Sequence, residues 1–243
     1  MDVFKLTDKT IFVTGASSGI GKEIAISVSK IGAKVIISGR NQERLNETFN
    51  ELSGDGHLAL VADLTDEKQI ADLVDKLPKL NGVVFSAGLT AHMPVKFIRQ
   101  TNIDYLFNIN FESPVLTTSR LLKKKKILNN GSIVFLSSIG SKYSYFGGAM
   151  YSSSKAALET YSRVLAMELA PKKIRANCLS PTFVKTPMVD GAEQTISKDV
   201  MDNFERMSPL GFGEPVDVAN AAIFYLSDAS RWITGTNLSL GGS

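Results

Sequence analysis

Tyr151 and Lys155 lie four residues apart in a stretch whose pattern predicts a helix over about 150–170. Side chains at this spacing share one face of a helix. An ammonium group beside a phenol favours the phenolate and lowers its pKa from about 10 toward neutral pH. A tyrosine tuned in this way can donate a proton to a carbonyl oxygen during reduction, or accept one from an alcohol. The same spacing also suits a tyrosine ring packed on a lysine stem, so the pair alone does not establish catalysis.

Two polar residues that precede this pair could complete a catalytic group. Ser138 follows a predicted strand over 132–136, and the carboxyl ends of strands are where doubly wound sheets bind ligands. Its hydroxyl could orient a substrate oxygen beside Tyr151. Asn110 lies inside a predicted helix over 102–124, where asparagine is a poor helix former and could hold a water molecule. The alternative for Asn110 is an ordinary polar helix residue.

A glycine-rich turn follows the first predicted strand and opens the first predicted helix. It reads Thr14-Gly15-Ala16-Ser17-Ser18-Gly19-Ile20-Gly21. Glycines let the backbone approach a pyrophosphate closely, and a helix N-terminus supplies free N–H groups and positive potential. The structural alternative is a tight turn that needs glycine only for its positive φ.

The same letters, Gly15-Ala16-Ser17-Ser18-Gly19, also fit the G-x-S-x-G nucleophile elbow of hydrolases. That fold needs a histidine late in the chain, after an acidic residue. The last histidine here is His92. An elbow on the first strand would also leave no earlier loop for an oxyanion hole, so we disfavour a hydrolase.

The residues after the second predicted strand bear on the choice of cofactor. Dinucleotide-binding folds that prefer NAD usually place an acid here, against the ribose 2′-hydroxyl. This chain has Ser38-Gly39-Arg40 instead. A guanidinium suits a 2′-phosphate through forked, charge-assisted hydrogen bonds, which favours NADP over NAD. A solvated surface arginine is the alternative.

Short apolar runs alternate with longer amphipathic stretches along the whole chain. We predict strands over 10–14, 34–38, 57–61, 82–85, 132–136, 174–179 and 237–240. We predict helices over 19–31, 41–52, 66–76, 102–124, 150–170 and 215–227, with Thr65 capping the third of them. This alternation predicts an α/β fold, a doubly wound Rossmann-like sheet of about seven parallel strands with helices on both faces. We predict one domain over 1–243, in which the irregular stretch 185–212 forms a substrate lid.

Composition excludes several classes of protein. The 243 residues include 27 Lys and Arg against 24 Asp and Glu, a net charge of +3, which argues against a dedicated nucleic-acid binder. One cysteine and two histidines permit no intramolecular disulfide and make a structural metal site improbable. No apolar run approaches the roughly 20 residues of a membrane span, and no signal peptide is visible. We therefore expect a soluble cytoplasmic protein without a membrane partner.

Taken together and in order, these motifs resemble the classical short-chain dehydrogenases/reductases over essentially the whole chain. The turn from Thr14 to Gly21 resembles the family's cofactor turn, and Asp63-Leu64 its adenine contact. The catalytic tetrad of the family is matched by Asn110, Ser138, Tyr151 and Lys155. The nicotinamide segment is matched by Pro181 to Met188, with Val184 and Thr186 at its contact positions, and Ile233-Thr234-Gly235 matches the C-terminal motif.

The resemblance implies that NADPH delivers a hydride to a carbonyl carbon and that Tyr151 donates the proton. It further implies that Lys155 binds the nicotinamide ribose and lowers the pKa of Tyr151, that Ser138 positions the carbonyl, and that Asn110 holds a water linked to Lys155. It also implies a homodimer or homotetramer. The cofactor residues that it implies are Gly15, Ser17, Ser18, Gly19, Ile20, Gly21, Arg40, Asp63, Leu64, Ala87, Gly88, Tyr151, Lys155, Val184 and Thr186.

Three segments depart from the family pattern. Phe85-Ser86-Ala87-Gly88 replaces Asn-Asn-Ala-Gly, which removes the asparagine hydrogen bonds that brace the fourth strand. Pro181-Thr182 replaces Pro-Gly in the nicotinamide loop, and Leu240-Gly241-Gly242-Ser243 replaces Val-Asp-Gly-Gly at the C-terminus. None of these changes removes a catalytic group.

Length and pattern most resemble the 3-oxoacyl-acyl-carrier-protein reductases, so we expect an acyl-thioester carbonyl substrate. The basic runs Lys123–Lys126 and Lys172-Lys173 could meet an acidic acyl carrier protein. A pocket from 139–149 and 185–212 would be largely apolar. Relatives that act on sugars, steroids or small alcohols share this frame. A non-catalytic NADP-binding sensor is the alternative of another class, although it would need no proton donor.

Overall fold

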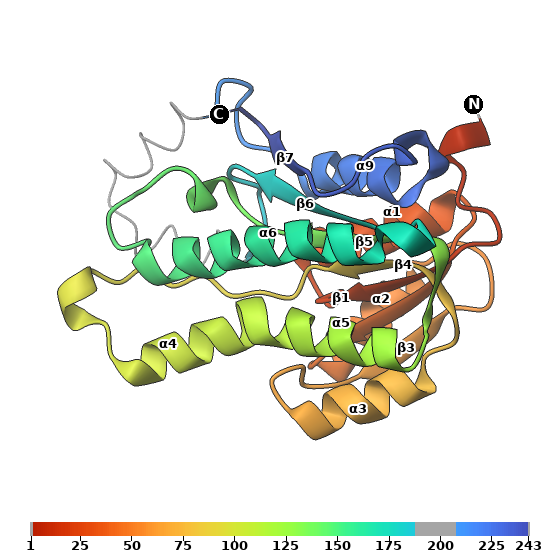
Figure 1. Ribbon diagram of the computed structural model, residues 1–243, viewed down its shortest axis with the longest axis horizontal. Helices are drawn as coiled ribbons and strands as arrows, with labels where there is room; N and C mark the ends of the chain where they lie inside the picture. The colour runs from red at the N-terminus through yellow and green to blue at the C-terminus, as the bar shows by residue number, and fades with distance from the viewer. Residues whose placement is uncertain (1, 188–207, 243) are drawn as a thin grey trace.

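The computed structural model describes residues 2–187 and 208–242. These residues form one seven-stranded sheet in the order β3-β2-β1-β4-β5-β6-β7, in which every neighbouring pair is parallel (Figure 1). The strand order reverses between β1 and β4, which confirms the predicted doubly wound fold. The strands are β1 (Thr10–Thr14), β2 (Lys34–Gly39), β3 (Leu58–Val61), β4 (Leu80–Phe85), β5 (Ile127–Leu136), β6 (Arg175–Pro181) and β7 (Asn237–Leu240).

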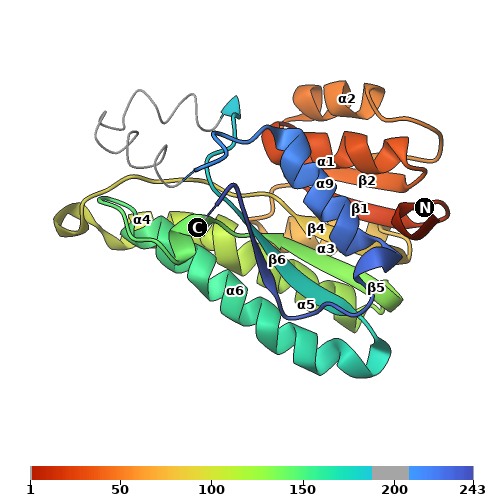
Figure 2. The same ribbon diagram turned by 90° about the horizontal axis from the view of Figure 1, so that it is seen from above.

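Helices cover both faces of the sheet, as Figure 2 shows from above. On one face lie α1 (Gly19–Lys30), α2 (Gln42–Asn50) and α9 (Pro215–Leu226). On the other lie α3 (Glu67–Lys76), α4 (Gln100–Phe107), α5 (Ser113–Lys123) and α6 (Ala149–Leu169). The predicted elements agree with these bounds to within a few residues, except that β5 begins five residues earlier than expected.

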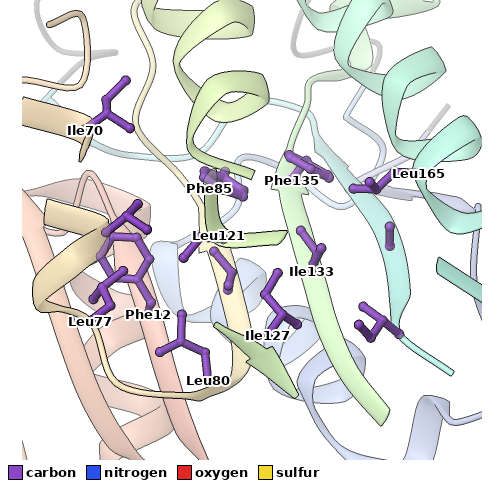
Figure 3. Packing of buried hydrophobic residues seen from close by; sticks show 14 of the residues in the cluster. Phe12, Ile70, Leu77, Leu80, Phe85, Leu121, Ile127, Ile133, Phe135 and Leu165 are labelled. Carbon is purple, nitrogen blue, oxygen red and sulfur yellow. The ribbon is translucent and has the colours of Figure 1, made fainter. Parts of the chain in front are cut away.

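The apolar core is divided into two layers by the sheet, because successive strand residues point to opposite faces. Phe12 and Ile133 belong to the layer against α3, α5 and α6, whereas Val13 and Val134 belong to the layer against α1 and α9. Figure 3 shows the first layer, where Phe12 lies near Leu77 at the end of α3. This two-sided burial explains why the strands are continuously apolar rather than alternating.

One departure from the family pattern is explained by this core. Phe85 is only 4% exposed, and its ring stacks on Phe135 of the neighbouring strand with centroids 5.1 Å apart (Figure 3). The end of β4 is therefore held by an aromatic cross-strand pair where the family uses asparagine hydrogen bonds.

Local capping corrects one prediction. The N-cap of α3 is Asp66 rather than Thr65. The Asp66 carboxylate accepts hydrogen bonds from the backbone N–H groups of Lys68 and Gln69 at 2.8 and 3.2 Å. Thr65 instead donates its hydroxyl to the carboxylate of Asp63 at 2.8 Å. Both residues are good caps, and the one-residue shift lies within the usual uncertainty of helix ends.

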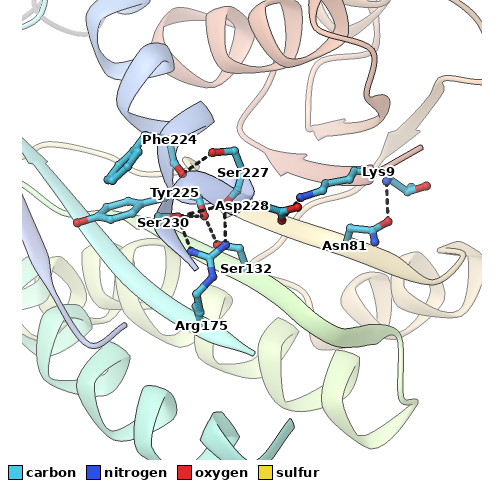
Figure 4. A network of polar contacts seen from close by, with 10 residues as sticks. Lys9, Asn81, Ser132, Arg175, Phe224, Tyr225, Ser227, Asp228 and Ser230 are labelled. Carbon is cyan, nitrogen blue, oxygen red and sulfur yellow. Dashed lines mark hydrogen bonds and ion pairs between the residues drawn. The ribbon is translucent and has the colours of Figure 1, made fainter. Parts of the chain in front are cut away.

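A polar network at the amino ends of the strands ties the last part of the chain to the sheet (Figure 4). Arg175, at the start of β6, donates to the hydroxyl of Ser230 at 2.7 Å. Ser132 of β5 donates to the carbonyl oxygen of Tyr225 in α9 at 2.7 Å. Because the two donors are buried, these bonds fix α9 and the turn after it against the sheet.

Within residues 2–187 and 208–242, no helix is long and apolar enough to cross a membrane. Nor do the His, Cys, Asp and Glu side chains of that part of the chain gather into a group that could hold a metal ion.

Candidate active site

A cavity of about 750 Å³ opens where β1, β2, β4, β5 and β6 end. This is the edge at which a doubly wound sheet binds its ligand. Fifteen of the predicted site residues line the cavity: Gly15, Ser17, Ser18, Gly19, Ile20, Gly21, Arg40, Leu64, Ala87, Gly88, Ser138, Tyr151, Lys155, Val184 and Thr186. Two predicted residues, Asp63 and Asn110, do not line it.

The glycine turn has the geometry of a phosphate cradle. Gly15 has a φ of +66°, and a Cβ at this position would lie 2.6 Å from the backbone nitrogen of Ala87. A Cβ at Gly21 would overlap the carbonyl oxygen of Gly15. Ser18, the N-cap of α1, makes no side-chain capping bond, and the first turn of α1 has no acidic residue. The N–H groups at this helix end are therefore available to an anion, which fits the pyrophosphate of a dinucleotide.

At the end of the cavity beside β2, two arginines line the wall. Arg40 follows β2, and Arg44 lies one turn into α2. Both are exposed, and neither forms an ion pair within the described part of the chain. Sequence reasoning missed Arg44, although its spacing of four residues from Arg40 was a usable signal. Two unpaired guanidinium groups at this end suit a phosphate group.

The side chain of Asp63 is engaged in a local turn. Its carboxylate accepts hydrogen bonds from the N–H and hydroxyl of Thr65, at 2.9 and 2.8 Å. Ala62 and Leu64 on either side of it line the cavity instead. An acceptor already engaged in a local turn has less capacity for an adenine amino group, so an adenine contact by Asp63 stays a prediction.

Ser138, Tyr151 and Lys155 come together on the cavity wall, from the end of β5 and from α6. Ser138 begins a short 3-10 helix over Ile139–Ser141 and accepts the N–H of Gly140 at 3.2 Å. Its hydroxyl lies close enough to the phenol of Tyr151 to oppose a rise in the pKa of that phenol. The Lys155 amine is buried, donates to the carbonyl oxygen of Leu136 at 2.7 Å, and lies 5.7 Å from the centre of the Tyr151 ring.

The electrostatics of this group differ from the sequence-based expectation. Burial raises the pKa of Tyr151, and the nearby Ser138 side chain only partly opposes this. Burial also lowers the pKa of Lys155 to about 8. In the ligand-free site, desolvation therefore outweighs the stabilisation of the phenolate that we expected from Lys155.

Asn110 lies behind the cavity, in a π-helical segment over Asn108–Glu112 that joins α4 to α5. Its side chain pairs with both backbone groups of Leu89, accepting from N–H at 2.8 Å and donating to C=O at 2.9 Å, and also donates to Ser154 at 3.1 Å. A Cβ at Gly88 would lie 3.3 Å from Asn110 Oδ1 and 3.4 Å from Lys155 Nζ. Asn110 thus braces the loop after β4, and the water expected beside it stays a prediction. Helical periodicity gave no sign of the π-helical turn, although such turns often mark functional sites.

The wall after β6 explains a second departure from the family pattern. Thr182 lies beside the C-terminal segment and donates its N–H to Leu240 at 2.9 Å. A Cβ at Gly241 would overlap the Thr182 hydroxyl. The two unusual residues therefore fit one another. Most of the predicted lid, residues 188–207, lies outside the described residues.

His92 is a cavity residue that sequence reasoning did not place in the site. It lies in the loop after β4, and its ring is stacked against that of Tyr145 with centroids 6.4 Å apart. Its buried Nε2 atom has no hydrogen-bond partner in the described structure. No motif surrounds His92 in the sequence, so only the fold reveals its position.

Comparison with known proteins agrees with this geometry. Residues 15–242 match the family model described as enoyl-(acyl carrier protein) reductase. The chain is 34% identical to 3-oxoacyl-[acyl-carrier-protein] reductase FabG of Rickettsia felis, covering 98% of this chain and 97% of the relative. It is also 34% identical to L-xylulose reductase of Caenorhabditis elegans, covering 98% and 96%. A putative short-chain alcohol dehydrogenase from Sinorhizobium meliloti has a similar structure, with a TM-score of 0.90, 28% identity, and coverage of 99% and 97%. From these matches we conclude that the chain belongs to the short-chain dehydrogenase/reductase family of oxidoreductases.

Proposed function

We propose that the protein is an NADPH-dependent reductase that converts a carbonyl to an alcohol, with a 3-oxoacyl thioester as its substrate. The observation that carries the proposal is the meeting of Ser138, Tyr151 and Lys155 in one cavity with the glycine cradle and two free arginines. The similarity to FabG supports the choice of a thioester. The similarity to L-xylulose reductase makes a sugar ketone the second candidate.

Each part of the cavity has a task in this reaction. When bound, NADPH supplies the hydride. The N-terminus of α1 and Arg40 would hold its phosphates, and Lys155 its nicotinamide ribose. Ser138 and Tyr151 lie on the same cavity wall, so a carbonyl oxygen placed against both is oriented and then receives the Tyr151 proton. The Lys155 ammonium stabilises the phenolate that remains.

The two basic runs of the sequence lie at the opposite end of the strands from the cavity. Lys123–Lys126 lies at the end of α5, just before β5, and Lys172-Lys173 lies just before β6. Both runs are therefore at the amino ends of the strands, whereas the cavity is at the carboxyl ends. Within the first run, Lys124 pairs with Asp75 at 2.9 Å. We therefore do not assign carrier-protein docking to these lysines. The proposal concerns the thioester group alone.

The direct test is the loss of NADPH absorbance with a short 3-oxoacyl thioester at saturating cofactor. Turnover of the thioester above that of pentulose sugars and cyclic ketones supports the proposal. Faster turnover of a sugar or a cyclic ketone replaces the substrate but retains the reductase. Binding of NADPH with no turnover of any of these carbonyls favours a non-catalytic sensor.

Arg40→Ala is expected to weaken NADPH binding about tenfold or more, while NADH binding changes less than about twofold. The reason is that only NADPH carries the 2′-phosphate that a guanidinium would recognise. Both dissociation constants can be measured by fluorescence titration of the reduced cofactor. Equal weakening of the two cofactors would contradict the assignment. Arg44→Ala provides a comparison at the second arginine.

His92→Ala is expected to raise the KM for the carbonyl substrate about threefold to tenfold, with the NADPH dissociation constant unchanged. The imidazole of His92 lines the cavity and would contact a polar group of the substrate there, and one lost hydrogen bond of this kind costs about 1 kcal/mol. His92→Gln retains a donor and should recover part of the loss. An unchanged KM in both variants would remove His92 from the substrate pocket.

We further propose that the protein forms a homodimer or homotetramer. The outer surfaces of α4 and α6, the helices on one face of the sheet in Figure 2, carry exposed apolar side chains. Tyr105 is 61% exposed and Met167 is 78% exposed. Apolar side chains on one side of the molecule support an association surface.

A further inference from the structure

A buried carboxylate lies beside the catalytic residues and takes no part in the mechanism above. Glu159 is 7% exposed and follows Tyr151 and Lys155 at the same four-residue spacing on α6. Its Oε1 atom accepts hydrogen bonds from three serine hydroxyls, at distances of 2.5 to 3.1 Å. The donors are Ser137, Ser141 and Ser180.

The three serines belong to three different segments around the cavity. Ser137 directly follows β5, Ser141 is the last residue of the 3-10 helix that Ser138 caps, and Ser180 is the next-to-last residue of β6. Ser137 and Ser141 thus flank Ser138 on both sides. Ser180 directly precedes Pro181, the first residue of the nicotinamide segment. One oxygen atom therefore joins the substrate-orienting loop to the wall after β6.

Stability alone does not account for this arrangement. No lysine or arginine of the described residues forms an ion pair with Glu159. A buried carboxylate is costly unless it is fully hydrogen bonded, and apolar residues usually fill such a site at lower cost. Hydrogen bonds to a charged acceptor are shorter and stronger than neutral ones, so they fix their donors more tightly. What Glu159 adds is a fixed geometry for the segments it joins.

We propose that Glu159 is a positioning residue, which holds Ser138 in its place beside Tyr151 by hydrogen bonding to the serines on either side of it. The proposal rests on the proposed function, because it assigns Ser138 the orientation of a carbonyl oxygen. Glu159 does not itself line the cavity, although Ser137, one of its three donors, does. Its effect on the reaction is therefore indirect and depends on the positions of the segments that carry the three serines.

The test compares Glu159→Leu with Glu159→Gln. Leucine removes the acceptor, and we expect kcat to fall roughly 10- to 100-fold, since small displacements of a positioning group cost about this much. The NADPH dissociation constant should change less than about threefold, because the glycine cradle and Arg40 are untouched. Glutamine retains a carbonyl acceptor and should restore most of kcat. Equal losses in the two variants, or a full kcat in Glu159→Leu, would overturn the proposal.

Leu165→Ala is the matched control for lost stability. Leu165 is buried on the same helix, away from the three serines, so its truncation lowers Tm without moving Ser138. We expect this variant to keep its kcat at a temperature where both proteins are folded. If Leu165→Ala lowers kcat as much as Glu159→Leu does, Glu159 has only a structural role.

A second measurement is independent of the substrate. Amide hydrogen exchange of the ligand-free protein should accelerate over residues 137–141 in Glu159→Leu and stay unchanged there in Leu165→Ala. Hydrogen exchange does not require turnover, so it tests the positioning role of Glu159 even if the wild-type protein reduces none of the carbonyls tested. Failure of the proposed reductase function and failure of the positioning role can therefore be distinguished. Unchanged exchange over residues 137–141 in Glu159→Leu would overturn the positioning role.

Discussion

Tyr151→Phe is expected to lower kcat for carbonyl reduction roughly 10²- to 10⁴-fold, the contribution typical of a positioned general acid. The substitution removes the phenolic hydroxyl beside Ser138 and leaves the ring in place. NADPH binding should change less than about threefold, because a proton donated only in the transition state contributes little to ground-state binding. A steady-state assay together with cofactor titration measures both quantities.

The control for Tyr151→Phe is Tyr143→Phe. Tyr143 is 39% exposed and does not line the cavity. We expect its kcat to equal that of the wild type. Wild-type turnover by Tyr151→Phe would show that another group donates the proton. A loss of NADPH binding as large as the loss of turnover would show instead that the variant has disturbed the cofactor site.

Lys155→Met is expected to make the ligand-free protein more stable and nearly inactive. Burial lowers the pKa of Lys155 from 10.5 to about 8, so the folded protein bears the cost of a buried ammonium at pH 7. Each pKa unit corresponds to about 1.4 kcal/mol, and the lost hydrogen bond to Leu136 offsets about 1 kcal/mol. We expect the free energy of unfolding to rise by about 2 kcal/mol at pH 7. We expect kcat/KM to fall roughly 10²-fold, because no cation then stabilises the phenolate.

The pH dependence gives this prediction a second measurement. The folded protein loses the Lys155 proton above pH 8, whereas the unfolded chain keeps it until about pH 10.5. The unfolded state therefore binds more protons in this window, and stability rises with pH because of Lys155. The thiol of Cys178 has the opposite effect, since burial raises its pKa to about 12 and stability falls above about pH 9. The gain in stability of Lys155→Met over wild type should accordingly shrink between pH 7 and 9.

Urea unfolding at pH 7 and pH 9, without cofactor, measures these differences. Lys76→Met is the control, because Lys76 is exposed at the end of α3 and its removal should not change the pH dependence. A Lys155→Met protein less stable than the wild type at pH 7 would contradict the burial cost. Added NADPH should stabilise the wild type more than the variant.

The strand and helix pattern was sufficient to predict most of the fold. Both faces of the sheet are buried, so its strands are continuously apolar, as Ile11–Val13 are. The glycine turn and the spacing of Tyr151 and Lys155 likewise predicted which residues line one cavity. These features are local, and each is determined by a few neighbouring residues. Ser138 could be added because parallel strands end at the same edge.

Other features of the site could not be predicted from the sequence. Asp63 is engaged by Thr65 in the turn before α3, and the π-helical turn at Asn110 has no compositional signature. The prediction that Lys155 lowers the pKa of Tyr151 considered the neighbouring charge and omitted desolvation. Glu159 could have been noticed as an acid on the buried face of α6, but its three donors come from segments up to 22 residues away.

The fit between Thr182 and Gly241 also constrains how this sequence could have diverged. The family pattern has glycine in the nicotinamide loop and aspartate in the C-terminal segment, and this chain has a side chain at the first position and none at the second. Because a Cβ at position 241 and the Thr182 hydroxyl overlap, a side chain at position 241 requires Thr182 to change its rotamer. The two departures are therefore coupled: the residue tolerated at one position depends on the residue at the other.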